Sequence, residues 1–331
     1  MPPRPADAGG VVHGGAETFV LDSILLGDTD RAGQPSNLAW KTYGYDLDGL
    51  ITDKSSRDVC TLLSGSPFSN QADGKGGIDN AVGSVVLPVL ETLAELPTPS
   101  AIATQVIRAG GFTLEIALDG PSDVPGTAGI GGQVFTGAAL DSPPAFDGTT
   151  SWPVLASSLM DGATLAGGAR VAFEDGYVTG DGTFVSGVPS DAPIVIPLRF
   201  PDRVQGALVL RIHHAVLTFQ RDETDPTRLV NGTIAGVLDA DELAEAVQEY
   251  ANVNSPTLCG SSFDGIANQL RQAQDILRDG TNAPGVPCDA ISIGVGFTAR
   301  RVASPTIVAS DPPAPPNLCD TPDAGPDAPG G

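Results

Sequence analysis

Aspartate and glycine stand next to each other in turn after turn of this chain, and this repetition limits what the chain can fold into. Glycine adopts positive φ at little cost, and an aspartate side chain hydrogen-bonds the backbone of its own turn. Turns of this kind include Gly27-Asp28-Thr29-Asp30, Asp46-Leu47-Asp48-Gly49, Asp73-Gly74, Asp119-Gly120, Asp161-Gly162, Gly180-Asp181-Gly182 and Asp264-Gly265. Such frequent turns predict many short connected elements, and their clustered carboxylates are potential calcium ligands.

The charge of the chain argues against one class of partner. With 40 acidic residues against 17 Lys and Arg, the formal net charge is −23. A phosphate backbone would be repelled and no basic patch offsets the repulsion, so we expect no nucleic-acid partner. We also expect no membrane insertion, because no stretch approaches the roughly 18 apolar residues of a spanning helix. The acidity can serve solubility alone, or it can attract cations.

Most of the chain after residue 110 shows the period-two pattern of β-strands. Strands are predicted at 19–26, 112–118, 133–136, 169–173, 182–185, 194–200, 207–220, 228–238 and 290–299, and a strand or an extended segment at 38–45. The segment 207–220 is apolar on both faces, which predicts a central strand that is covered on both sides. Short strands separated by turn signals indicate a sandwich, a barrel or a large antiparallel sheet.

Two pairs of helices are expected beside these strands. In the first pair, Pro88 should kink or split one helix, and Thr98-Pro99 begins the other with a cap and a proline at the first helical position. The second pair begins with Asp239-Ala-Asp-Glu242, which has the pattern of a capping box, and continues from Ser261.

These patterns together predict an α+β fold. We expect a mainly antiparallel β-sheet, sandwich-like or a single large sheet, with two helical pairs packed on it. Residues 17–310 would form a single globular domain. Residues 1–16 would be a flexible leader, and residues 311–331 a tail rich in Pro, Asp and Gly.

The four cysteines, Cys60, Cys259, Cys288 and Cys319, contain no Cys-x-x-Cys pair, and the chain has only three histidines, so a zinc site is not expected. An even, widely spaced set fits two disulfides in an oxidising compartment. Of the three possible connectivities, we favour Cys259–Cys288 with Cys60–Cys319. Four buried free thiols are the alternative.

Calcium is the ligand that the acidic turns favour most. This ion takes six to eight oxygen ligands from carboxylates, carbonyls and amides. The candidate ligands are Asp28, Asp30, Asp46, Asp48, Asp53, Asp73, Asp79 and Asn80. None of the turns completes the EF-hand pattern, so we expect a site that two loops would assemble. The alternative is that these side chains only cap solvated turns.

No catalytic motif is present: Gly-x-Ser-x-Gly, His-Glu-x-x-His and the Walker A loop are all missing. His213 and His214 are neighbours on a predicted strand and point to opposite faces, so they cannot chelate one metal ion. We expect a buried histidine that hydrogen-bonds a backbone carbonyl. The catalytic residues, if the chain is an enzyme, are unknown, and the alternative functions are a hydrolase with an acid or metal-assisted site and a carrier of an apolar ligand.

The ends of the chain carry linkers, Ala6-Asp-Ala-Gly-Gly10 and Pro322-Asp-Ala-Gly-Pro-Asp-Ala-Pro-Gly-Gly331, and Gly76-Gly-Ile-Asp-Asn80 precedes a predicted helix. In these features the chain resembles uncharacterised secreted bacterial lipoprotein-like proteins, although it lacks their lipidated N-terminal cysteine. The resemblance implies no activity. With the cysteine pattern, it favours an exported protein, extracellular, periplasmic or at the cell surface and in a mature or trimmed form. We expect a non-enzymatic structural or binding role, with calcium as a stabilising ligand.

Overall fold

The computed structural model describes residues 1–6, 15–94, 98–187, 191–200 and 206–320. Within these ranges, eight strands pair in a closed antiparallel circuit, β3-β2-β1-β10-β9-β8-β6-β5, and the pairing of β5 with β3 completes the barrel. The barrel strands are β1 (Glu17–Leu25), β2 (Thr113–Leu118), β3 (Ala128–Gly137), β5 (Val171–Val178), β6 (Thr183–Val185), β8 (Leu208–Arg221), β9 (Arg228–Asp239) and β10 (Ala290–Val302).

Three further strands lie outside this circuit. The strand β4 (Val154–Leu155) pairs with β3, β11 (Val308–Ala309) lies parallel to β4, and β7 (Ile194–Leu198) pairs with β8. The predicted sandwich-like or open sheet is therefore wrong. Closure depends on β3 offering one edge to β2 and the other to β5, and an alternating apolar pattern is the same in an open sheet and in a barrel.

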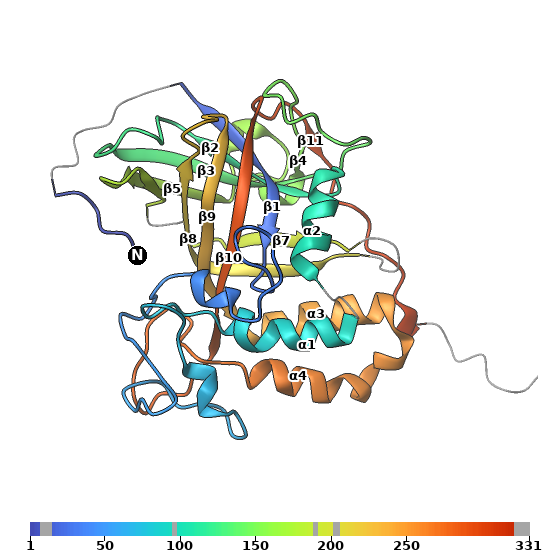
Figure 1. The fold of residues 1–331 in the computed structure, drawn as a ribbon. Helices are drawn as coiled ribbons and strands as arrows, with labels where there is room; N and C mark the ends of the chain where they lie inside the picture. The colour runs from blue at the N-terminus through green and yellow to red at the C-terminus, as the bar shows by residue number, and fades with distance from the viewer. Residues whose placement is uncertain (7–14, 95–97, 188–190, 201–205, 321–331) are drawn as a thin grey trace, which may run out of the picture.

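The described helices are α1 (Leu87–Ala94), α2 (Pro99–Arg108), α3 (Ala240–Asn254) and α4 (Asp264–Arg271). They do not form two pairs on a sheet: α2 packs on β1, whereas α3 packs on β8 and on α4 (Figure 1). The capping residue of α3 is as predicted, because Asp239 accepts hydrogen bonds from the amides of Asp241 and Glu242 at 2.8 and 3.1 Å. One large apolar core joins the barrel interior to these helices.

Two local predictions have different outcomes. The segment before Pro88 is a π-helical turn, Val82–Val86, and α1 begins at Leu87, so the expected helix is split near its proline. The strand predicted at 38–45 is wrong, since Ala39–Thr42 is a short 3₁₀ helix, η1. The chain turns there to bury Tyr43, whose hydroxyl donates to the Thr29 carbonyl at 2.9 Å.

Two disulfides are present, but their connectivity differs from the one we favoured. Cys60 bonds Cys288, and Cys259 bonds Cys319. The first joins the loop after η1 to the loop before β10, and the second ties the C-terminal segment to the region after α3. Among the described residues, no helix is long and apolar enough to cross a membrane. The linker sequences at 6–10 and 322–331 fall almost entirely outside the described residues.

Candidate metal centre

Three of the predicted calcium ligands come together in the loops beside the barrel. Asp46, Asp48 and Asp79 each offer a carboxylate oxygen, and these oxygens lie within 4.8 Å of one another. Asp46 and Asp48 belong to one tight turn, in which their Oδ1 atoms accept from the amides of Gly49 and Leu50 at 2.7 and 2.8 Å. These turn bonds hold the carboxylates of Asp46 and Asp48 near each other.

Asp79 reaches the turn from a second loop. Its backbone amide donates to the Tyr45 carbonyl at 3.0 Å, and its Oδ2 accepts from the Leu47 amide at 2.7 Å. The segment just before the turn lies against β10. At Gly294 of that strand, a Cβ atom would lie 2.4 Å from the Tyr43 carbonyl oxygen, so glycine is required for this close approach.

Asn80 is not a member of the cluster, contrary to its place among the predicted ligands. Its Nδ2 lies within hydrogen-bond distance of the carbonyls of Trp40, Tyr43 and Gly294 at 3.3, 3.1 and 2.9 Å. Its Oδ1 accepts from the Gly83 amide at 2.9 Å. The side chain thus joins η1, β10 and the start of the helical segment, and it holds the neighbouring Asp79 in place.

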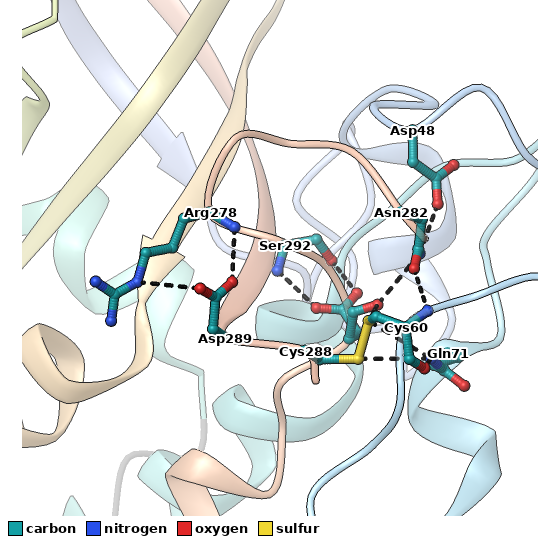
Figure 2. Close-up of a disulfide and its surroundings, with 9 residues drawn as sticks. Asp48, Cys60, Gln71, Arg278, Asn282, Cys288, Asp289 and Ser292 are labelled. Atoms are coloured by element: carbon teal, nitrogen blue, oxygen red, sulfur yellow. Dashed lines mark hydrogen bonds and ion pairs between the residues drawn. A yellow bond between two sulfur atoms is a disulfide. The ribbon is translucent and has the colours of Figure 1, made fainter. Parts of the chain in front are cut away.

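Behind the cluster, a buried acid links it to the barrel. Asp275 accepts from both the amide and the hydroxyl of Ser292, at 2.8 and 2.6 Å. Figure 2 shows this region together with the Cys60–Cys288 disulfide. Asn282 connects the two sides, since its Nδ2 donates to Asp48 Oδ2 at 2.8 Å and its Oδ1 accepts from the Cys60 amide.

Several aspartates in this region have raised pKa values. Burial raises the pKa of Asp79 to about 9, and the charges of Asp48 and Asp275 add to the rise. Burial also raises the pKa of Asp275 to about 7 and that of Asp73 to about 6, although hydrogen bonds from Ser292 and Thr52 oppose these shifts. Among the described residues, none of the carboxylates in the cluster pairs with Lys, Arg or His within 4.0 Å.

The remaining predicted ligands lie elsewhere or are already engaged. Asp28 accepts from the amide of Ser100 at 3.3 Å and from its hydroxyl, so it binds the first turn of α2. Asp30 and Asp53 stabilise their own turns, through the amides of Ala32 and Ser55 at 2.9 and 2.7 Å. Asp73 is near enough to raise the pKa of Asp79 but binds Thr52 with both oxygens.

Sequence reasoning missed Asp275, Asn282 and Ser292. The helix predicted from Ser261 is found as α4, which ends at Arg271, so Asp275 lies outside it. After this helix the chain bends toward β10, where the Asp275 amide donates to the Ala290 carbonyl at 3.1 Å. The polar run Gln-Ala-Gln-Asp at 272–275 carried the only local signal, and it does not say where an aspartate will be buried.

The histidine prediction also needs correction. The His213 side chain is partly exposed, and its Nε2 lies 2.8 Å from Glu242 Oε2, which is also partly exposed. The partner of this nitrogen is therefore a carboxylate and not the predicted backbone carbonyl.

Comparisons of the chain with protein-family models, with curated proteins and with solved structures find no significant match.

Proposed function

We propose that this protein is an exported, non-enzymatic binding protein whose loops are stabilised by calcium at Asp46, Asp48 and Asp79. The observation that carries the proposal is the approach of three carboxylates to within 4.8 Å, from two loops that are themselves rigidly hydrogen-bonded. Like charges at this separation repel strongly in a half-buried place, and either protonation or a bound cation relieves the repulsion.

The donor set fits a hard cation. All three side chains supply carboxylate oxygens, which calcium prefers over nitrogen or sulfur ligands. Asp46 and Asp79 each use one oxygen to hold a loop amide, so their other oxygens can contact an ion without breaking these bonds. Asp48 holds the Leu50 amide with Oδ1 and accepts from Asn282 with Oδ2, so an ion would share an Asp48 oxygen with one of these donors. A bound divalent cation would tie the 46–48 turn to residue 79, and the ion would contribute stability to the loops rather than chemistry.

Two disulfides support an oxidising compartment, which is where exported proteins keep such bonds. The hydrolase alternative has less support. A general acid must reach its substrate, yet Asp79 and Asp275 are only 5% and 7% exposed. Their raised pKa values are explained by burial and by neighbouring carboxylates.

A thermal melt in calcium, compared with a melt in chelator, tests the proposal. A ligand that binds only the folded state stabilises it by about 2.7 kcal/mol at a concentration 100 times its Kd. We expect calcium to raise the midpoint of the wild type, and Asp46→Asn to abolish most of that rise. Asp53→Asn is the matched control, because Asp53 is an exposed turn residue outside the cluster, and it should respond as the wild type does. Equal midpoints in calcium and in chelator would remove the proposal.

A further inference from the structure

A cavity of about 360 Å³ lies between β3, β7 and β8, and its lining includes no residue of the cluster Asp46, Asp48 and Asp79. It occurs where strand pairing does not close the wall: β3 pairs with β5 as far as Val134, and β7 pairs with β8. Thr136 of β3 bridges part of this gap, donating its hydroxyl to the Val195 carbonyl at 3.3 Å.

The lining of the cavity is mainly apolar. Leu114, Val134 and Val171 form its buried floor, and half-buried residues of the β7–β8 hairpin form one wall. These wall residues are Val195, Pro197 and Val209. Half-buried aliphatic side chains around a cavity of this volume are typical of a small-molecule site.

Arg211 gives the cavity its charge. It stands directly opposite Val195 in the β7–β8 ladder and lines the cavity beside Val209. Two acids that line a neighbouring pocket with Arg211 have other partners: Asp239 pairs with Arg278, and Glu242 contacts His213, each at 2.8 Å. Within the described ranges, Arg211 forms no ion pair or side-chain hydrogen bond.

A second arginine lies at the same cavity. Arg170 lines it next to Ser157, and its Nε donates to the Ser157 carbonyl at 2.9 Å. Two of the 17 basic residues therefore line one apolar cavity in a chain of net charge −23. An anionic head group would find complementary charge here, whereas the acidic surface elsewhere would repel it.

We propose that this cavity binds an aliphatic monocarboxylate of medium chain length, with Arg211 receiving the carboxylate and the apolar wall covering the alkyl chain. A volume of 360 Å³ holds roughly a dozen groups of about 30 Å³, the space that one water molecule occupies. Octanoate and decanoate have the matching size. Guanidinium binds a carboxylate in a bidentate manner, which favours this head group over an alcohol or an amine. The inference does not depend on the calcium site.

Isothermal titration calorimetry of the full chain with hexanoate, octanoate and decanoate, below their micelle concentrations, tests this proposal. We expect one site, with affinity rising roughly fourfold for each buried methylene group. Because hydrogen bonds to charged groups are the stronger ones, 1-octanol should bind about tenfold more weakly than octanoate. No binding of octanoate, or equal binding of octanoate and octanol, would overturn the proposal.

Two variants locate the site. Arg211→Gln should remove the preference for octanoate over octanol, and Val209→Trp, which fills the cavity, should abolish binding of both. Arg57→Gln is the control, since Arg57 is exposed and lies in the loop before Cys60, away from this cavity. If Val209→Trp does not fold, as judged by its thermal melt, Arg211→Gln decides alone. Octanoate binding that Arg211→Gln leaves unchanged would contradict the assignment.

Discussion

Asn282 donates a hydrogen bond to Asp48 across 234 residues of sequence, at 2.8 Å, and with its other amide atom it accepts from the backbone of Cys60. One side chain thus connects the acidic turn, the disulfide and the loop that leads to β10 (Figure 2). The acid cluster and the Cys60–Cys288 bond are consequently parts of one loop assembly and should respond together when either is changed.

Asn282→Ala should lower the free energy of unfolding by about 1–3 kcal/mol, because it removes the partner of an Asp48 carboxylate oxygen and of the backbone amide of the buried Cys60. Urea denaturation measures the loss. The matched control is Asn268→Ala, an exposed asparagine of α4, which should change stability by less than about 0.5 kcal/mol. Equal losses in the two variants would mean that the Asn282 contacts contribute nothing.

Asp79 should make stability depend on pH when calcium is absent. Its pKa is raised from 3.8 to about 9, so the folded protein binds the proton more tightly than the unfolded chain does. The stabilisation that protonated Asp79 contributes is therefore fully present below pH 3.8 and is lost as the pH rises toward 9. The free energy of unfolding should fall by at most about 1.4 kcal/mol per pH unit in this range. Urea denaturation in chelator at about pH 5, 7 and 9 measures how steeply the free energy of unfolding falls with pH. In Asp79→Asn the slope should be shallower, and an unchanged slope would contradict the shift.

Removing the two disulfides should have unequal costs. The Cys60–Cys288 bond spans 228 residues and the Cys259–Cys319 bond spans 60. Chain entropy predicts losses of about 5 and about 4 kcal/mol for the paired Cys→Ser replacements. Peptide mapping without reduction should recover Cys60 joined to Cys288. A recovered Cys259–Cys288 peptide would instead support the pairing that we first favoured.

Glu115 is a buried acid that should weaken the barrel. It lies on β2 between Val20 and Phe135, is fully buried, and in the described part of the chain neither carboxylate oxygen has a hydrogen-bond partner. Burial raises the pKa of Glu115 well above the usual value of about 4.5. The folded protein therefore holds this proton more tightly than the unfolded chain, and the free energy of unfolding falls as the pH rises above about 4.5. Glu115→Leu should therefore stabilise the protein by about 1–3 kcal/mol, and by more at pH 8 than at pH 4.

Glu115→Gln is the control for shape in the same experiment. It keeps the size and polarity of the side chain but cannot ionise, so it should remove the pH dependence without the gain from an apolar replacement. Destabilisation by Glu115→Leu at both pH values would show that the carboxyl has a partner that stabilises it.

Much of the local structure was predictable, and the reason differs from one element to another. Asp239 caps α3 because a cap depends on residues only three positions apart. The strand predicted at 207–220 is found as β8, Leu208–Arg221, since a long segment that is apolar on both faces favours a strand covered on both sides. The segment 38–45 misled us because the burial of Tyr43 against Thr29, and not the local pattern, determines its shape.

By itself, the sequence determined the turns, the period of the strands, the acidity and the turn in which Asp46 and Asp48 share one space, because each depends on residues close together in the chain. Only the tertiary structure decided that β3 meets β5 to close a barrel, that Cys60 pairs with Cys288, and that Asp79 and Asn282 join the acidic turn. These contacts join segments far apart in sequence, and their selection depends on how the whole core packs, which no local pattern encodes.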